Sequence, residues 1–476
     1  MINLRKDEMA LKKEATYKLM KLNADTLTPI ELFQRLTGEK KFLLESTFQH
    51  ETKGKYSFIG CDPYGEIIGY DDTTEHIDYI NHTDKTIDQN ALTYMEEHLP
   101  HISIDLPLPF YGGAIGYVGY DAIRSIEDIG ETLTNDLAMP DIHFMLYKNI
   151  LVFDHASEIL YVIAIRGDAD QANDLDYQLE LLRKQIQQTN PTSNQQETPF
   201  TFYPEISKEA FQQQVVAAKK HIQQGDIFQV VLSQRMKATF EGDTFSFYRQ
   251  LRKVNPSPYM FYIDFGEYLI LGASPESLIE TRGRNVMTNP IAGTRPRGKT
   301  PVEDERLMKE LLKDDKEIAE HRMLVDLSRN DLGRICEIGS IHIPTYMTIE
   351  KYQHVMHIVS EVHGKLRKGC SSFTALISCL PAGTVSGAPK IRAMQIINEL
   401  EGTKRGVYGG GIGFINYNHD VTMALAIRSL VVKEKHAYLQ TGAGIVHDSE
   451  PDKEYLETLF KAKSLMEVST NDFTTG

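Results

Sequence analysis

The sequence predicts a protein in which helices and strands are mixed and bury a large core. Apolar residues recur at helical spacing in three segments, 207–225, 315–334 and 450–466. Apolar bursts or the alternation typical of strands occur in three others, 41–60, 227–236 and 354–366. With 476 residues, 41% of them hydrophobic, the chain is long enough for one large core or for two domains.

Local signals set the ends of these elements. Ser207 is a good N-cap for the first helix, and Gly225 is a good stop. In the strand that follows, Gln229 projects to the side opposite its apolar neighbours. Residues 289–298, NPIAGTRPRG, predict a turn-rich loop because they combine Pro and Gly. The polar stretch 167–200 predicts a linker or surface excursion.

Composition excludes several classes of protein. A formal net charge of -15 argues against a nucleic-acid partner and against a membrane surface. No apolar run approaches the ~18 residues of a membrane span, and the N-terminus lacks the apolar core of a signal peptide. The cysteines show no metal-ligand spacing, so we expect reduced thiols in a cytoplasmic protein. They are Cys61, Cys336, Cys370 and Cys379.

An acidic pair distinguishes the helix predicted at 315–334. At about 100° per residue, Glu317 and Glu320 extend the apolar face that carries Leu324, whereas Arg322 lies on the opposite face. Carboxylates on a core-facing stripe are costly unless they are paired, protonated or bound to metal. An inward salt bridge or an exposed edge of the stripe is the alternative explanation.

The helix predicted at 450–466 also carries a pair of glutamates on a mostly apolar helix. Glu454 and Glu457 are three residues apart, and Lys461 follows one turn later. The rest of the helix is expected to be mostly buried, through Tyr455, Leu456, Leu459, Phe460, Ala462, Leu465 and Met466. Two carboxylate pairs that converge would favour a hard divalent cation such as Mg²⁺, because all their ligand atoms are oxygens. The alternative is an acidic strip facing solvent.

Other polar residues are ambiguous when taken singly. Glu276 follows a predicted strand at a Ser-Pro turn, where a surface loop explains it equally well. His357 lies among apolar residues, and a hydrogen-bonded core histidine is the usual reason. Arg428 is suited to binding a carboxylate or to a structural ion pair. Glu45 and Ser46 fit ordinary chemistry at the end of a strand.

Taken together and in order, several motifs resemble those of the chorismate-utilising enzymes, and within that family the large components of anthranilate synthase. They are LLES, PIAGTRPRG, AEHRMLVDLSRNDLGR, VMHIVSEV, PAGTVSGAPKIRAMQII and TGAGIVHDSEPDKEYLE. The likeness spans nearly the whole chain and is strongest over 207–466. It implies an α+β fold in which two packed, mostly antiparallel sheets are wrapped by helices.

The resemblance also implies a reaction. Water-adding relatives carry a lysine base where this chain has Gln229, and many aminodeoxychorismate synthases carry a nucleophilic lysine where it has Ala292. Because both lysines are missing, the resemblance implies that ammonia attacks the substrate directly. The expected activity is that of an aminating lyase that converts chorismate and ammonia to anthranilate and pyruvate. An aminodeoxychorismate synthase without the lysine, and a non-catalytic sensor of tryptophan or chorismate, are the alternatives.

The resemblance assigns roles to individual residues. Glu276 is the expected general acid, His357 assists the second half-reaction, and Thr384 binds the ring carboxylate. A magnesium ion beside Lys461 is expected on Glu317, Glu320, Glu454 and Glu457. The enolpyruvyl carboxylate is expected on Tyr408, Arg428 and the amides of Gly442, Ala443 and Gly444.

Two partners are implied as well. Because no cysteine lies in a Gly-x-Cys-x-Gly turn, ammonia is expected from a separate glutamine amidotransferase subunit. Tryptophan is the expected feedback inhibitor. Its site would be formed by Glu45, Ser46, Pro258, Tyr259 and Met260, with Lys55 as a weaker candidate. Residues 15–166 would then be an N-terminal region carrying part of this site, and 201–467 the chorismate-binding catalytic region.

Overall fold

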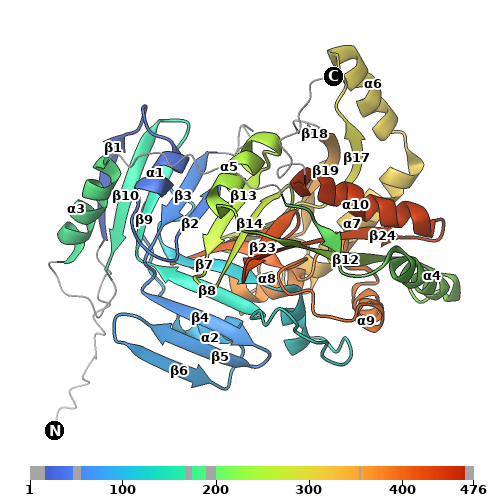
Figure 1. The fold of residues 1–476 in the computed structure, drawn as a ribbon, viewed down its shortest axis with the longest axis horizontal. Helices are drawn as coiled ribbons and strands as arrows, with labels where there is room; N and C mark the ends of the chain where they lie inside the picture. The colour runs from blue at the N-terminus through green and yellow to red at the C-terminus, as the bar shows by residue number, and fades with distance from the viewer. Residues whose placement is uncertain (1–16, 47–54, 167–173, 189–199, 353–354, 467–476) are drawn as a thin grey trace, which may run out of the picture.

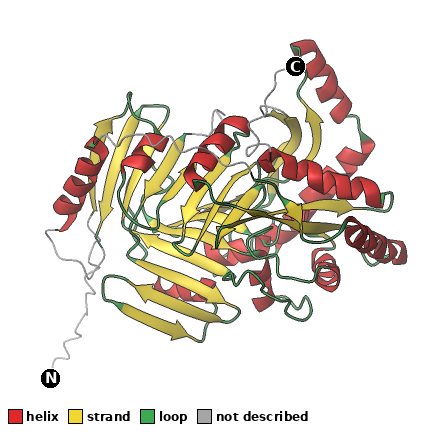
Figure 2. Ribbon diagram, in the orientation of Figure 1, coloured by secondary structure: helices red, strands yellow, loops and turns green. Residues whose placement is uncertain are grey.

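The computed structural model describes residues 17–46, 55–166, 174–188, 200–352 and 355–466. Two large sheets dominate it, and helices surround them (Figures 1 and 2). All the strand pairs within them are antiparallel in the described part of the chain. The α+β class with two mostly antiparallel sheets is therefore confirmed.

The first sheet combines strands from both halves of the chain. Its order is β1 (Tyr17–Asn23), β10 (Ile159–Ile165), β9 (Asn149–Asp154), β3 (Tyr56–Gly60), β2 (Phe42–Glu45), β13 (Tyr259–Asp264), β14 (Tyr268–Ser274), β23 (Ser429–Lys433), β24 (His436–Ile445), β12 (Gln229–Thr239) and β11 (Tyr203–Pro204), with β20 (Gly387–Ala388) beside β12.

The second sheet is equally mixed. Its order is β17 (Ile291–Pro296), β19 (Val355–Lys365), β16 (Asn285–Thr288), β15 (Ser277–Arg282), β22 (Val421–Leu425), β21 (Gly411–Asn416), β7 (Gly113–Val118), β8 (Ile142–Tyr147), β4 (Gly65–Tyr70), β5 (Thr73–Asp78) and β6 (Thr83–Ile87), with β18 (His342–Lys351) beside β19.

The helices are α1 (Pro29–Arg35), α2 (Ala91–His98), α3 (Asp174–Gln187), α4 (Lys208–Gln224), α5 (Thr244–Val254), α6 (Pro301–Leu311), α7 (Asp315–Gly333), α8 (Ser372–Cys379), α9 (Lys390–Leu400) and α10 (Pro451–Met466), with the 3₁₀ turns η1 (Tyr120–Ser125) and η2 (Gly383–Val385). In the described ranges, none of these helices is both long and apolar enough to cross a membrane.

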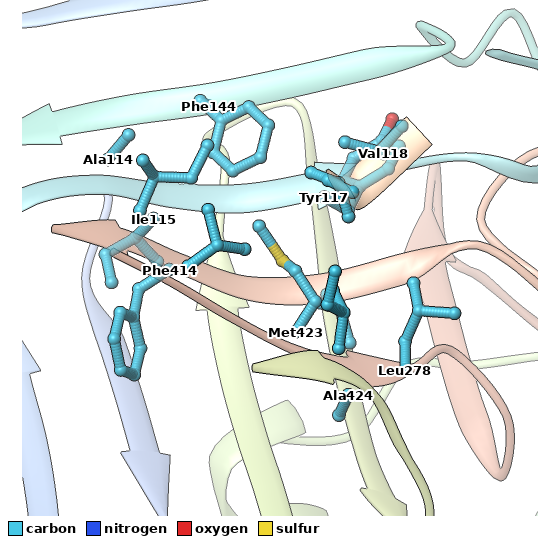
Figure 3. Packing of buried hydrophobic residues seen from close by; sticks show 14 of the residues in the cluster. Ala114, Ile115, Tyr117, Val118, Phe144, Leu278, Phe414, Met423 and Ala424 are labelled. Atoms are coloured by element: carbon cyan, nitrogen blue, oxygen red, sulfur yellow. The ribbon is translucent and has the colours of Figure 1, made fainter. Parts of the chain in front are cut away.

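The main core lies where the two sheets pack, and strand alternation builds it. Phe42 and Phe261 of the first sheet belong to the same apolar cluster as Ile115 and Phe414 of the second. Figure 3 shows part of this cluster. Their strand neighbours Leu43 and Met260 point the other way, into a second cluster that also contains residues of α1, α3 and α5. One strand therefore serves two cores, which is the expected result of a two-residue period.

The helix boundaries largely follow the sequence signals. Ser207 Oγ accepts a hydrogen bond from the Ala210 amide, and Gly225 ends α4 in the left-handed region at a φ of 84°. Within the stretch 167–200, predicted to be a linker or surface excursion, the structure describes α3, whose Leu179 and Leu182 are buried in the second cluster. The described part of this stretch is therefore a helix that packs on the first sheet.

Two further expectations fail. Residues 291–296 form strand β17, although a loop was predicted from their Gly and Pro content. The register of β17 against β19 shifts between Ala292 and Thr294, so Gly293, at a φ of 78°, occupies a bulge. On α10, Leu456 is 58% exposed and Phe460 is 74% exposed, so this helix is less buried than its composition indicated.

Candidate active site

The predicted catalytic charges lie where the chain crosses from one sheet to the other. Glu276 lies between β14 of the first sheet and β15 of the second, and Arg428 lies between β22 of the second and β23 of the first. The two crossings run side by side. The Leu425 amide donates to the Glu276 carbonyl at 2.9 Å, and the Ala273 amide donates to the Arg428 carbonyl at 3.1 Å.

Glu276 is a buried acid. Its residue is 7% exposed, and burial raises the pKa of its carboxyl to about 8, against the opposing effects of Thr384 and Arg428. Thr384 of η2 donates its hydroxyl to Glu276 Oε1 at 2.9 Å. At neutral pH the group is therefore a carboxylic acid with a proton to give.

His357 has the opposite character. Burial, helped by the charge of Arg428, lowers the pKa of its imidazole to about 4, so the ring is neutral at pH 7. Its Nδ1 lies 3.1 Å from the Gly293 carbonyl oxygen, which only accepts, so Nδ1 carries the proton. Nε2 then holds a lone pair, and it is buried without a hydrogen-bond partner among the described residues. The charge of Arg428 thus lowers the pKa of both groups, the acid Glu276 and the neutral acceptor His357.

The two acids on α7 are half-buried and differently engaged. Glu317 Oε1 forms an ion pair with Arg295 Nη1 at 3.1 Å. Glu320 Oε1 accepts from Gln229 Nε2 at 3.2 Å, and burial raises the pKa of Glu320, with a further increase from Glu317. Both acids are partly buried, and the ion pair of Glu317 with Arg295 is the salt bridge that was the alternative explanation for the pair.

Glu454 on α10 is influenced by the same two lysines as Glu320, namely Lys316 and Lys461. Glu454 is buried, and its Oε2 has no hydrogen-bond partner in the described chain. Glu457 is exposed and pairs with Lys461 at 2.8 Å. Burial raises the pKa of Glu320 and of Glu454, and in both cases the charge of Lys461 opposes that increase. The two helices therefore contribute to one electrostatic neighbourhood. Within the described residues, however, no three His, Cys, Asp or Glu side chains are grouped closely enough to hold a metal ion.

Two glycines on β24 leave room for the side chains of Tyr408 and Gln229 to lie against the backbone of this strand. A Cβ atom at Gly442 would lie 2.7 Å from the Tyr408 hydroxyl, and one at Gly444 would lie 2.6 Å from Gln229 Nε2. Lys461 Nζ donates to the Gly442 carbonyl at 2.9 Å. The predicted substrate-binding residues Tyr408, Gly442, Gly444 and Lys461 are thus brought together, and Ala443 is buried between the two glycines.

No pattern in the sequence predicts a role for Arg405. Its guanidinium donates to Glu401, to the Val385 carbonyl at 2.6 Å and to the Val231 carbonyl at 2.7 Å. It also lies 5.6 Å from the ring centroid of Tyr408. Val385 directly follows Thr384, so this one side chain ties the Thr384 turn to β12 and to Tyr408. Glu401 and Tyr408 are close to Arg405 in sequence, whereas Val385 and Val231 are 20 and 174 residues away, so only the fold shows that one side chain joins them all.

The residues predicted for tryptophan binding lie on neighbouring strands of the first sheet. Glu45 of β2 pairs with Met260 of β13. The Glu45 carboxylate accepts from the Tyr248 hydroxyl at 2.8 Å and forms an ion pair with Arg252 at 3.1 Å. These two partners on α5 were not predicted.

The other predicted members of this cluster differ in exposure. Ser46 and Tyr259 are half-buried, and Pro258 is buried. Lys55 is exposed, with its ammonium 5.2 Å from the Tyr56 ring centroid.

His354, where many relatives are expected to carry Arg, lies outside the described residues.

This arrangement defines a class of protein. The sequence model of chorismate binding enzymes matches residues 39–467, and the chain belongs to that family. It is 43% identical to anthranilate synthase component 1 of Lactococcus lactis over 95% of this chain and 99% of that protein. Anthranilate synthase component 1 of Thermus thermophilus is 41% identical to this chain, over 94% of this chain and 96% of that protein.

Solved structures agree on the fold. Anthranilate synthase component I from Streptococcus pneumoniae superposes with a TM-score of 0.80 at 41% identity, over 93% of this chain and 98% of that one. The menaquinone-specific isochorismate synthase of Escherichia coli shares the fold at a TM-score of 0.72 and 18% identity, over 96% and 95%.

The raised pKa of Glu276 predicts a pH-dependent stability. Between about pH 4.5 and 8 the unfolded carboxyl is ionised while the folded one keeps its proton, so folding takes up a proton and stability falls as pH rises. Glu276→Gln cannot titrate. Its free energy of unfolding, measured by urea denaturation, should therefore gain steadily on that of the wild type across this window. A difference independent of pH would contradict the assignment.

The Arg405–Glu401 pair predicts non-additive stability effects. Arg405→Met should cost roughly 3–5 kcal/mol, because it leaves the buried Glu401 carboxylate unpaired. The double variant Arg405→Met, Glu401→Met should cost less than the two single changes added together. Chemical denaturation of the three variants checks this, and simple additivity would show that the pair does not act as a unit.

Proposed function

We propose that the protein is a lyase that converts chorismate and ammonia to anthranilate and pyruvate. The observation that carries this proposal is the buried, protonated Glu276, bonded to Thr384 and influenced by Arg428. Such an acid suits a reaction in which hydroxide must leave, because hydroxide is a poor leaving group unless it is protonated. The relatives named anthranilate synthase component 1 support the same reaction.

The proposed reaction has two halves, the addition of ammonia with loss of water and then the loss of pyruvate. As the ammonia nitrogen bonds to C2, the ring double bonds shift, the C4–O bond breaks and Glu276 supplies the proton that makes the leaving group water. The C2 proton is then lost, the enolpyruvyl group leaves as pyruvate and the ring becomes aromatic. His357 assists this second half, since its Nε2 lone pair is free to accept a proton.

Charge decides how the substrate binds. Chorismate is a dicarboxylate, and Arg428 offers a guanidinium for the enolpyruvyl carboxylate, with Tyr408 and the amides of residues 442–444 beside it. Thr384, whose hydroxyl donates to Glu276 at 2.9 Å in the free protein, would turn to the ring carboxylate when chorismate binds.

The acidic neighbourhood suits magnesium chemically. All the donors are carboxylate oxygens, and the unpartnered, buried Oε2 of Glu454 is an atom that a cation would satisfy. Glu320 and Glu457 would hold the ion, with Glu317 and Glu454 acting directly or through water. When bound, it would supply positive charge for the ring carboxylate. Glu317 and Glu457 would first have to leave Arg295 and Lys461.

Free ammonia is the nucleophile in this proposal, because the chain has the uncharged residues Gln229 and Ala292 where relatives are expected to carry lysines. Gln229 is engaged with Glu320, and Ala292 offers neither a base nor an amine. Burial raises the pKa of the Cys61 thiol to about 12 and that of Cys336 to about 11, so neither is an activated nucleophile for glutamine hydrolysis. Ammonia would then come from a separate amidotransferase subunit. All four cysteines are free thiols, as expected for a cytoplasmic protein.

The purified chain should form fluorescent anthranilate from chorismate, Mg²⁺ and ammonium. Glutamine alone should give none, and a chelator should stop turnover. Glu276→Gln should lower kcat by roughly 10²–10⁴-fold while chorismate still binds, because the loss is confined to proton transfer. Fluorescence and titration calorimetry measure the two quantities.

Mass analysis and chromatography of the product supply the control. The 4-amino isomer or isochorismate in place of anthranilate would refute the proposal, and so would a complete lack of turnover. Product formed by this chain with glutamine as the sole nitrogen source would refute the need for a second subunit.

Feedback by tryptophan is the regulatory part of the proposal. Glu45 and Ser46 would bind the amino group, and Pro258, Tyr259 and Met260 would contact the ligand. The strands offer a direct connection, since Glu45 pairs with Met260, Met260 pairs with Ala273, and Glu276 follows three residues later. Inhibition requires that tryptophan bind one state of this ladder better than another.

Ser46→Phe should abolish inhibition by tryptophan and leave the uninhibited rate close to that of the wild type. The reason is steric, because the added ring would crowd the ligand amino group that Ser46 is proposed to bind. Anthranilate formation across a tryptophan titration measures this effect. Unchanged sensitivity would remove Ser46 from the site.

A further inference from the structure

A small cavity lies next to Glu276 and is not used in the chemistry described above. It has a volume of about 30 Å³, and its lining includes Glu276, Thr384, Thr288, Asn289, Ser328 and Asp331. A cavity needs about 10–15 Å³ of such volume to hold one water molecule. The space therefore suits a molecule of the size of water and is too small for any part of a chorismate ring.

Asn289 is the unusual member of this lining. It is 2% exposed, and neither Oδ1 nor Nδ2 has a hydrogen-bond partner in the described chain. Thr288, which is 6% exposed, has an equally unpartnered Oγ1. A buried polar group left without a hydrogen-bond partner destabilises the folded protein. Such a cluster is explained if a small molecule that both donates and accepts hydrogen bonds occupies the cavity.

Ser277 Oγ, another lining atom, is also buried without a hydrogen-bond partner in the described chain, whereas the charged group Asp331 and the Thr384 hydroxyl are paired. Asp331 accepts from Lys390 Nζ at 2.7 Å, and burial raises the pKa of Asp331 while the lysine opposes that effect. The Thr384 hydroxyl is committed to Glu276. Charge at the Asp331 end is thus balanced, so the occupant is expected to be neutral.

We propose that this cavity binds the water that forms when the C4 hydroxyl leaves. The inference rests on the proposed function, in which Glu276 gives its proton to that hydroxyl as the C4–O bond breaks and the bonding electron pair stays on oxygen. The product water forms against Glu276, one wall of the cavity, and Asn289 offers it both a donor and an acceptor. In the resting protein the same site holds solvent water.

Two near-isosteric variants test this without altering a catalytic group. Asn289→Leu and Thr288→Val keep the shape of the side chains and remove their polar atoms. Each should lower kcat for anthranilate formation about 10-fold, as expected when a single hydrogen bond to the leaving group is lost, and leave the KM for ammonium unchanged. High-resolution crystal structures of the full chain should show an ordered water on Asn289 in the wild type and none there in Asn289→Leu.

Asn416→Leu is the matched control. Asn416 is 1% exposed on β21 and also has an unpartnered Nδ2 among the described residues, but it does not line this cavity. It should lower the Tm and leave kcat unchanged. If both cavity variants keep the wild-type kcat, or if the wild-type cavity is dry, the inference is wrong.

The kinetic pattern separates the remaining outcomes. A raised KM for ammonium with unchanged kcat would overturn the inference, because the cavity would then serve the nucleophile and not the leaving group. A wild type that binds water at Asn289 but forms no anthranilate from chorismate, Mg²⁺ and ammonium would refute the proposed function, and with it the catalytic role of this water.

Discussion

The constraint on which the site depends is the paired crossing of two chain segments between the sheets. Residues 274–277 and 425–429 leave one sheet and enter the other side by side. Ser274 Oγ donates to the Leu425 carbonyl at 2.7 Å, and main-chain hydrogen bonds join the segments on both sides of that contact. Because each crossing is anchored in two sheets, Glu276 and Arg428 are held with little freedom, although they are far apart in sequence.

The crossing also explains the left-handed backbone of Arg428. Its φ is 50°, a conformation that costs a non-glycine residue on the order of 1–3 kcal/mol. The surrounding hydrogen bonds over-determine that conformation. Burial raises the pKa of Glu276 and lowers that of His357. At neutral pH the first group is therefore a protonated acid and the second a neutral acceptor, which are the states that the proposed reaction needs.

Local signals predict part of the site, whereas the roles expected of Glu276, His357 and Arg428 come from the resemblance to the family. The inward placement of Glu317 and Glu320 follows from helical spacing, and the ends of α4 follow from its cap residues. Residues 291–296 were misassigned because Gly and Pro usually break strands, whereas here a bulge at Gly293 keeps β17 paired with β19. The exposure of Phe460 could not be predicted, since it depends on which face of α10 finds a neighbour. Arg405 could not be predicted either, because its partners come from three separate segments.

The same sheet that holds Glu276 reaches the proposed tryptophan residues, which bears on how a distant ligand acts. β2, β13 and β14 are consecutive in the first sheet, so Glu45, Met260 and Ala273 lie on one ladder that ends at the crossing. Tyr259 pairs with Ser274, whose hydroxyl fixes the neighbouring crossing through Leu425. A packed, hydrogen-bonded ladder does not deform gradually, so tryptophan bound as proposed would act by favouring one discrete placement of these strands. Such a change would reach the segment that carries Glu276 through Met260 and Ala273, without a long chain of intermediate contacts.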